Sequence, residues 1–248
     1  MYQKTRLDNI MQILDRQGYM TTRQLMNELH YSSATINRDL NLLEKQGLLK
    51  RKYGGAEKVE QRNIPLIYRY DKMRQEKRKL AKRAAEFVQA GDTIFIDGTT
   101  TTQIMGEYLT AVPDIKVITN NMALATYLSQ YGIKTICLGG EVFEVPHMLL
   151  GDITVQNTMS FRADKMFFST GGVTSQGRIY DSEYVMMHRA MAENSQKIYY
   201  LVDHEKLDRS VERILFDFDS VDCVISDFDF EEWVMQRYPE TEFVKIGD

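Results

Sequence analysis

The chain has 248 residues, 43% hydrophobic and 27% charged, a composition that supports a buried core and excludes a disordered, collagen-like or low-complexity protein. It contains no apolar run near the roughly 18 residues of a membrane span and no signal-type stretch after Met1, so we expect a cytoplasmic protein without membrane contact. The net charge of −4 hides a basic head, residues 1–56, ahead of an acidic body, which favours a nucleic-acid contact at one end.

Three helices are predicted in the head. Apolar residues recur at helical spacing over residues 4–16, which indicates a first amphipathic helix. Thr21 and Gln24 have the spacing of a capping box and start a short second helix. A third helix is expected over residues 33–46. Its buried face is formed by Ile36, Leu40 and Leu43.

The opposite face of the third helix carries short or hydrogen-bonding side chains, which a helix in the major groove needs to approach and read base edges. Residues 48–56 are basic, strand-prone and glycine-terminated, as suits a wing along phosphates. The alternative is a three-helix module with a solvated polar face. The residues expected to contact DNA are Ser33, Ala34, Thr35, Asn37, Arg38, Asn41, Lys50, Arg51, Lys52 and Tyr53.

Residues 31–56 resemble the winged helix-turn-helix signature of DeoR-type bacterial repressors, V-S-x-x-T-I-R-R-D-L followed by L-x-x-x-G-x-L-x-R and H-G-G-A. The resemblance spans roughly residues 3–58 and implies binding to duplex operator DNA. Two positions depart from the signature. Asn37 stands where the family usually has the first of two arginines, and Tyr53 replaces the common histidine.

A linker, residues 57–70, is predicted from Pro65 and the lack of any sustained period, and it separates the head from a body of residues 71–248. A helix with a basic face, expected to be solvated or to give auxiliary phosphate contacts, opens the body. Apolar runs then alternate with helical patterns such as 122–131 and 183–194, which indicates βαβ units and a mainly parallel α/β sheet. The expected strands are 93–97, 116–119, 134–138, 165–169, 197–202 and 221–226.

Ligands of open parallel sheets bind outside the carboxyl ends of the strands, and here those ends are polar or glycine-rich. The first strand ends at Asp97 and turns through four consecutive threonines into a helix near Gln103. Helical N–H groups and hydroxyls suit phosphate oxygens, although a threonine run after a strand is also an ordinary helix cap. The other loops are 119–121, 138–140, 169–172 and 202–206.

The body, over about residues 57–245, resembles the DeoR C-terminal sensor domain, with K-x-x-L/I-A-x-x-A-A, G-D-T-I-F-x-D, V-I-T-N-N, L-G-G and D-x-x-K-L in order. The family's fold is similar to ribose-5-phosphate isomerase, and its members generally sense phosphorylated sugars or related metabolites. The resemblance implies that the threonines hold a phosphate, Asn120 lines the sugar and Lys206 supplies a cation, while Thr99 departs from a usual glycine. The expected effector residues are Asp97, Gly98, Thr99, Thr100, Thr101, Thr102, Asn120, Gly139, Gly171, Glu183 and Lys206.

The competing hypothesis is a sugar-phosphate isomerase fused to a DNA-binding head. Isomerisation needs a carboxylate base, and the strand end at 169–172 has none, so we expect no catalysis. Glu183 is a conceivable base, but an acidic residue there is common in the sensor family without turnover. His188 stands where those sensors often have lysine.

Neither a metal site nor a cofactor is expected, because ligand spacing and the phosphate-binding and dinucleotide fingerprints are absent from the sequence. Cys137 and Cys223 are expected to be reduced core residues. We therefore predict a two-domain regulator of sugar or carbohydrate catabolism genes, a repressor rather than an activator, relieved or modulated by a phosphorylated metabolite. Paired DNA half-sites imply a homodimer or homotetramer.

Overall fold

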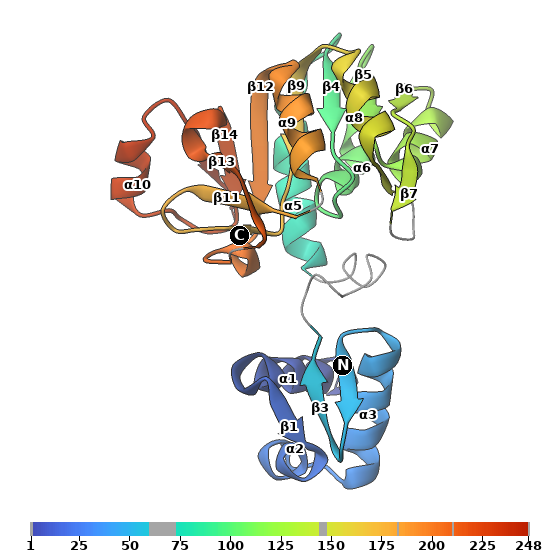
Figure 1. Ribbon diagram of the computed structural model, residues 1–248, viewed down its shortest axis with the longest axis vertical. Coiled ribbons are helices and arrows are strands. Elements are labelled where there is room, and N and C mark those ends of the chain that lie inside the picture. Colours follow the sequence, from blue (N-terminus) through green and yellow to red (C-terminus); the bar gives the residue numbers. More distant parts are fainter. Residues whose placement is uncertain (1, 60–72, 144–147, 183, 210, 248) are drawn as a thin grey trace. The chain divides into compact units, whose positions relative to one another are not determined.

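The computed structural model describes residues 2–59, 73–143, 148–182, 184–209 and 211–247, and it forms two compact units, Met1–Lys72 and Met73–Asp248 (Figure 1). Each unit is described here by itself. Most of the predicted linker, residues 57–70, lies outside the described residues, as does Glu183.

The head unit consists of three helices and a three-stranded antiparallel sheet of order β1-β3-β2. Its elements are α1 Tyr2–Gln17, β1 Tyr19–Thr21, α2 Thr22–Leu29, α3 Ser33–Lys45, β2 Leu49–Lys52 and β3 Gly55–Lys58. The three predicted helices are confirmed, and β3 runs two residues past position 56. The core contains Ile10, Leu14, Met20, Leu25, Ile36, Leu40, Leu43, Leu49 and Ala56.

Local sequence explains where these helices begin and why the wing turns tightly. The Thr21 side chain accepts from the Gln24 backbone N–H while Gln24 reaches back to Thr21, which is the predicted capping box. Gly54 has a φ of +70°, which glycine adopts without steric cost. A Cβ on Gly55 would lie 2.3 Å from the Met20 carbonyl oxygen, so only glycine lets β1 pair with β3 here.

The sensor unit, Met73–Asp248, contains a seven-stranded parallel sheet of order β15-β14-β12-β9-β4-β5-β6 (Figure 1). The chain builds the sheet from β4 towards β6 and then restarts at β9 on the other side of β4. This reversal creates the crevice between strand ends where such sheets bind ligands. The strands are β4 Thr93–Ile96, β5 Lys116–Thr119, β6 Lys134–Cys137, β9 Ala163–Phe168, β12 Ser195–Val202, β14 Cys223–Ser226 and β15 Glu242–Lys245.

Helices cover both faces of this sheet. One face packs α5 Arg74–Ala85, α6 Gly106–Leu109 and α7 Met122–Gln130 over Ile94, Ile96 and the alternate residues of neighbouring strands. The other face carries α8 Asp152–Met159 and α9 Val185–Glu193 (Figure 1). Because both faces are covered, the inner strands β4, β5 and β14 are largely buried on both sides, as their apolar sequences predicted.

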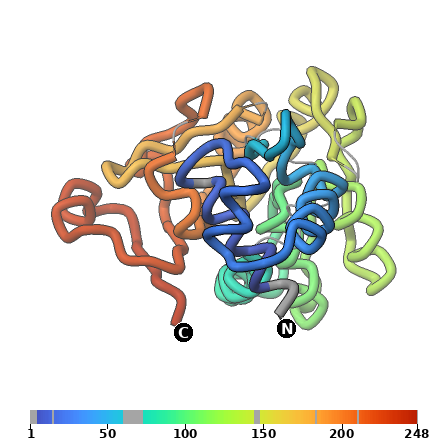
Figure 2. Tube along the Cα trace, turned by 90° about the horizontal axis from the view of Figure 1, so that it is seen from below, coloured from blue at the N-terminus to red at the C-terminus, as the bar shows by residue number. Residues whose placement is uncertain are grey.

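Smaller sheets and helices complete the unit. A two-stranded sheet joins β7 Glu141–Phe143 and β8 Met148–Leu150, and α10 Glu232–Arg237 projects at the sheet edge opposite α7 (Figure 2). A three-stranded antiparallel sheet joins β10 Gly172–Val173, β11 Arg178–Asp181 and β13 Arg213–Asp217. The strands β10, β11, β13 and β15 were not predicted from the sequence because they are short and lack a sustained apolar run.

The prediction of two core cysteines is wrong for Cys137. Cys223 is 1% exposed on the inner strand β14, whereas Cys137 is exposed because β6 is the edge strand of the sheet. Among the described residues, no helix is long and apolar enough to cross a bilayer.

Candidate DNA interface and effector site

The third helix of the head, α3, presents a polar face, and its opposite side is anchored by a partly buried ion pair. Asp39 points away from this face, is fully buried and pairs with Arg6 of α1, whose Nη2 lies 3.0 Å from Asp39 Oδ1. The guanidinium of Arg6 also lies 4.8 Å from the Tyr31 ring centroid, just before the helix. The side chains left exposed on α3 include the predicted contacts Ser33, Ala34, Arg38 and Asn41.

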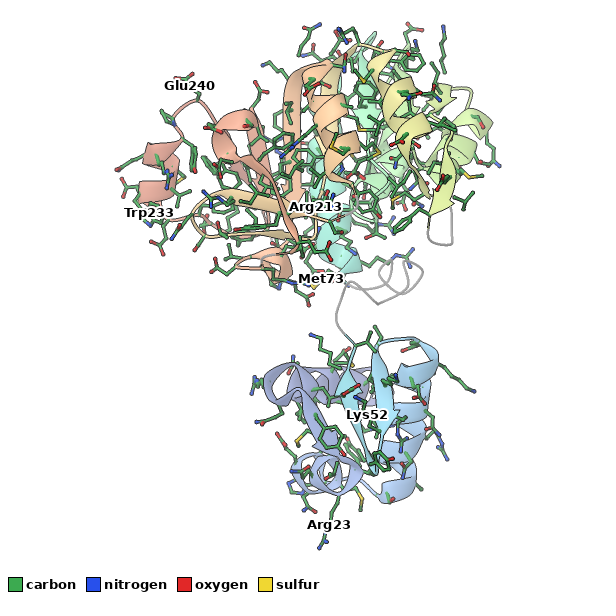
Figure 3. All side chains as sticks on the ribbon, viewed as in Figure 1. Arg23, Lys52, Met73, Arg213, Trp233 and Glu240 are labelled. Atoms are coloured by element: carbon green, nitrogen blue, oxygen red, sulfur yellow. The ribbon has the colours of Figure 1, made fainter. Side chains whose placement is uncertain are left out.

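Arg38 and Lys50 are exposed and make no ion pair or hydrogen bond within the described part of the chain, so their charges are available to an external polyanion. Lys52 on the wing (Figure 3) pairs with Glu57 at 2.7 Å, which offsets part of its charge. Tyr53 is fully exposed at the wing tip, and its carbonyl accepts from Tyr19 Oη at 2.9 Å.

Arg51 does not face outward with its two lysine neighbours. Its Nη1 donates to Asn41 Oδ1 and its Nη2 to Asn37 Oδ1, each at 2.8 Å, so the wing arginine lies over the polar face of α3. Asn37 in turn donates from Nδ2 to the Ser33 carbonyl at 2.9 Å. The structure thus joins four predicted DNA contacts, Ser33, Asn37, Asn41 and Arg51, into one cluster.

In the sensor unit, Asp97 follows the central strand β4 and is fully buried. One carboxylate oxygen accepts from the Thr99 hydroxyl at 2.9 Å and from the Thr102 hydroxyl. The other accepts from the Ser169 backbone N–H at 3.1 Å and faces His188 Nε2 at 3.0 Å. The hydroxyls of Thr99 and Thr102 therefore fix this carboxylate and hold the turn closed.

His188 on α9 lies between two carboxylates and was missed as a site residue. Its Nδ1 is 2.7 Å from Asp181 Oδ2, opposite the contact between Nε2 and Asp97. Burial opposes protonation of the fully buried ring, but hydrogen bonds to Asp181 and Asp97 raise the pKa of His188 to about 9. The imidazolium neutralises one of two carboxylates that would otherwise repel each other in the core.

The middle two threonines of the turn are each met by a lysine. Lys77 of α5, only 5% exposed, donates to Thr100 Oγ1 at 3.0 Å. Lys206, in the short helix His204–Lys206 after β12, lies 3.4 Å from Thr101 Oγ1 and 2.8 Å from Ser169 Oγ. Two ammonium groups from distant parts of the chain thus converge on one strand-end turn.

Asp203, at the end of β12, is the carboxylate beside these lysines. Lys206 Nζ is 3.3 Å from Asp203 Oδ2. Burial disfavours the charged carboxylate, yet the positive charges of Lys206 and Lys77 lower the pKa of Asp203. Lys206, Lys77 and Asp203 thus form a charged cluster beside the threonine turn.

The next strand end supplies amides. Asn120 is fully buried and donates to the Leu149 carbonyl at 2.9 Å, while its Oδ1 has no hydrogen-bond donor among the described residues. A Cβ on Gly98 would lie 2.5 Å from Met148 Cγ and 3.2 Å from Asn120 Oδ1, so glycine is required for this close approach. Asn120 thus offers an acceptor next to the threonine turn.

Two other predicted effector residues, Gly139 and Gly171, make no hydrogen bond to this cluster within the described part of the chain, and a third falls outside that part. Gly139 follows the edge strand β6, and its carbonyl accepts from Thr154 at 2.7 Å. Gly171 is exposed in the loop after β9, against Val211. Glu183 lies outside the described residues.

The helix expected near Gln103 is a 3-10 turn, Thr102–Met105, followed by the short α6. Its dipole is correspondingly small, and lysines rather than a long helix supply the positive charge. Thr99, the departure from glycine, has a negative φ, since it is absent from the left-handed residues of the described chain, so the substitution strains no backbone.

Lys77 had a signal in the sequence, because it is the first residue of the K-x-x-L-A pattern. It belongs to the basic face that was expected to be solvated or to contact phosphates, whereas the structure buries it. Asp203 likewise begins the D-x-x-K-L pattern that ends near Lys206. No group of three or more potential metal ligands occurs among the described residues.

Comparison with known protein families matches residues 6–62 to the DeoR-like helix-turn-helix domain and residues 72–228 to the DeoR C terminal sensor domain. The glycerol-3-phosphate regulon repressor of Escherichia coli strain K12 is 31% identical over 231 residues, which is 92% of each chain. The HTH-type transcriptional repressor GlcR of Bacillus subtilis strain 168 is 32% identical over 92% of this chain and 89% of its own.

Among solved structures, ribose 5 phosphate isomerase A from Neisseria gonorrhoeae is 16% identical over 54% of this chain and 53% of that chain. The TM-score is 0.39, an overlap too partial to support a functional argument.

Proposed function

Because the chain belongs to the DeoR family of transcriptional repressors, we propose that its head binds a specific operator and its sensor unit binds a phosphorylated sugar or polyol that weakens operator binding. The observation that carries the effector proposal is the convergence of Lys77 and Lys206 on the hydroxyls of Thr100 and Thr101. Hydroxyls and ammonium groups donate strong hydrogen bonds to phosphate oxygens.

The names of the relatives support this class of effector. Besides the glycerol-3-phosphate regulon repressor, lactose phosphotransferase system repressors from Staphylococcus epidermidis match this chain at 29% identity over 82% of its length. The lysine pair suits the dianionic end of such a ligand, and the unpaired acceptor of Asn120 suits a sugar hydroxyl.

The test of the complete proposal uses the full-length protein and duplexes selected by it from a random library. A panel of sugar and polyol phosphates, each with its dephosphorylated counterpart, is added to the protein–DNA complex in a fluorescence anisotropy assay. At least one phosphorylated compound is expected to release DNA by 5- to 150-fold in affinity, the usual range of such coupling, while its plain counterpart does not. Release by plain and phosphorylated forms alike would contradict a phosphate-reading turn.

Replacing Arg38 with alanine is expected to weaken binding to the selected operator by about 1–3 kcal/mol and to relax sequence preference. Arg38 is exposed on α3 with its donors unused in the described part of the chain, as a base-reading arginine requires. Lys50→Ala on the wing is the matched control. It should reduce the slope of log affinity against log salt concentration by about one and leave the sequence preference intact. Unchanged operator affinity in Arg38→Ala would refute the assignment of α3 as the recognition helix.

No isomerase turnover is expected. The buried Asp97 is saturated by five donors, three on one oxygen and two on the other, so it has no lone pair directed at a substrate carbon. Proton NMR of aldose and ketose phosphates incubated with the protein tests this. Conversion at an ordinary enzyme rate of roughly 1 per second or more, abolished by Glu183→Gln, would favour the isomerase alternative.

Such a head contacts one half-site, and operators read by helix-turn-helix proteins carry two half-sites about one helical turn apart or a multiple of it. We therefore propose a homodimer or homotetramer acting in the cytoplasm. Analytical ultracentrifugation with and without operator DNA measures the assembly.

A further inference from the structure

The basic side chains of strand β2 point to opposite faces of the strand. Leu49 and Arg51 share one face of the strand, and the Leu49 side chain is buried against the head core. Lys50 and Lys52 alternate with them and are exposed. Since successive side chains of a strand point to opposite faces, Arg51 is directed at α3, away from the face that presents the two lysines.

The guanidinium of Arg51 is held in a fork between two asparagines one helical turn apart. Asn37 and Asn41 each accept one hydrogen bond of 2.8 Å, and the Arg51 backbone N–H donates to Glu44 Oε1 at 2.8 Å. Asn37 is also anchored through Nδ2 to the carbonyl and hydroxyl of Ser33, at 2.9 and 3.1 Å. Both polar atoms of Asn37 are therefore engaged within the protein.

From this geometry we infer that Arg51, carried by the wing, is a specificity-determining residue that reads a base edge in the major groove, and that Asn37 and Asn41 position it. The inference rests on the proposed operator binding. The family signature has an arginine at position 37 of the helix, where this sequence has asparagine. Arg51 would supply a guanidinium at the same recognition face. The natural target is guanine, whose O6 and N7 accept two hydrogen bonds from one arginine.

The number of donors allows this role. A guanidinium has five N–H groups, and the asparagines use two of them in the described part of the chain, which leaves three for DNA. Because the side chain is already fixed in the free protein, little rotamer entropy is lost when it meets a base. A phosphate contact needs no such orientation, since phosphates follow every base pair alike.

The test compares full-length wild type, Arg51→Lys, Arg51→Ala and Lys50→Ala by selection from a random duplex library, followed by anisotropy on the selected duplex and its single-base variants at several salt concentrations. Arg51→Lys keeps the charge but loses the fork. Circular dichroism melting verifies that each variant is folded.

Both Arg51 variants are expected to lose preference at one base pair per half-site, with discrimination there falling roughly 5- to 150-fold, while Lys50→Ala keeps it. Asn37→Ala and Asn41→Ala should weaken preference at that same base pair and have little further effect in an Arg51→Ala background, which a role in folding alone would not produce.

If Arg51→Lys keeps every base preference, or Arg51→Ala loses affinity equally for all duplexes with a lower salt slope, Arg51 is a phosphate contact and the inference is overturned. If the wild type itself enriches no sequence, the operator-binding proposal fails, and that result is distinguishable from the first because it precedes any substitution.

Discussion

The change His188→Gln is expected to destabilise the sensor unit by about 3–5 kcal/mol, the typical cost of removing one partner from a buried ion pair. Glutamine cannot carry a positive charge, so Asp97 and Asp181 would face each other across the core without a counter-ion. Chemical denaturation followed by circular dichroism measures the loss. His204→Gln is the matched control, because His204 also contacts an aspartate, Asp227, but is largely exposed. Surface pairs contribute at most about 1 kcal/mol, so the control should be nearly neutral.

The same histidine predicts a pH dependence. The pKa of His188 is raised from about 6.5 in the unfolded chain to about 9 in the folded protein. Its contribution to stability is therefore complete below about pH 6.5 and is lost as the pH rises through about 9. Unfolding free energies measured from pH 6 to 10 should decline in the wild type and decline much less in His188→Gln. Parallel curves for the two proteins would show that the buried ring is neutral.

The change Lys77→Met is expected to weaken binding of a phosphorylated effector by roughly 10- to 150-fold, as expected for loss of a charge-assisted hydrogen bond worth about 1.5–3 kcal/mol. Methionine keeps much of the volume of the buried side chain while removing its ammonium group from Thr100. Binding of the dephosphorylated ligand should change little, because it has no dianion to meet the lysine. Isothermal titration of both ligands gives the two affinities.

Lys79→Met provides the control for Lys77→Met, since Lys79 is an exposed lysine of the same helix. It should leave both affinities unchanged. A Lys77→Met protein that binds the phosphorylated compound with wild-type affinity would remove the threonine turn from the effector site.

The sequence predicted regular elements better than it predicted their side-chain contacts. Strand 116–119 and the capping box at Thr21 were found with correct bounds because short-range periodicity and spacing determine them. The ion pair between Arg6 and Asp39 joins residues 33 positions apart, and no local pattern reports such a contact.

The effector site shows the same limit. The sequence located the threonine turn because the strand ends of a parallel sheet share one edge. Which hydroxyl of the turn contacts which partner depends on side chains that come from distant parts of the chain. The Thr102 hydroxyl donates to Asp97 and the Thr100 hydroxyl accepts from Lys77, although the sequence does not distinguish the four threonines. No local pattern marks His188 as a site residue, because its carboxylate partners lie just after β4 and at the end of β11, not on its own helix.

Lys77 also lies in the first turn of α5, next to the residue at which the sensor unit begins. Its backbone N–H donates at 2.9 Å to the carbonyl of Met73, the first residue of the sensor unit (Figure 3). Met73 has a φ of 54°, a left-handed conformation that costs a side-chain-bearing residue about 1–2 kcal/mol. Lys77 is thereby held at both ends, by its backbone to the left-handed residue that precedes α5 and by its ammonium group to Thr100.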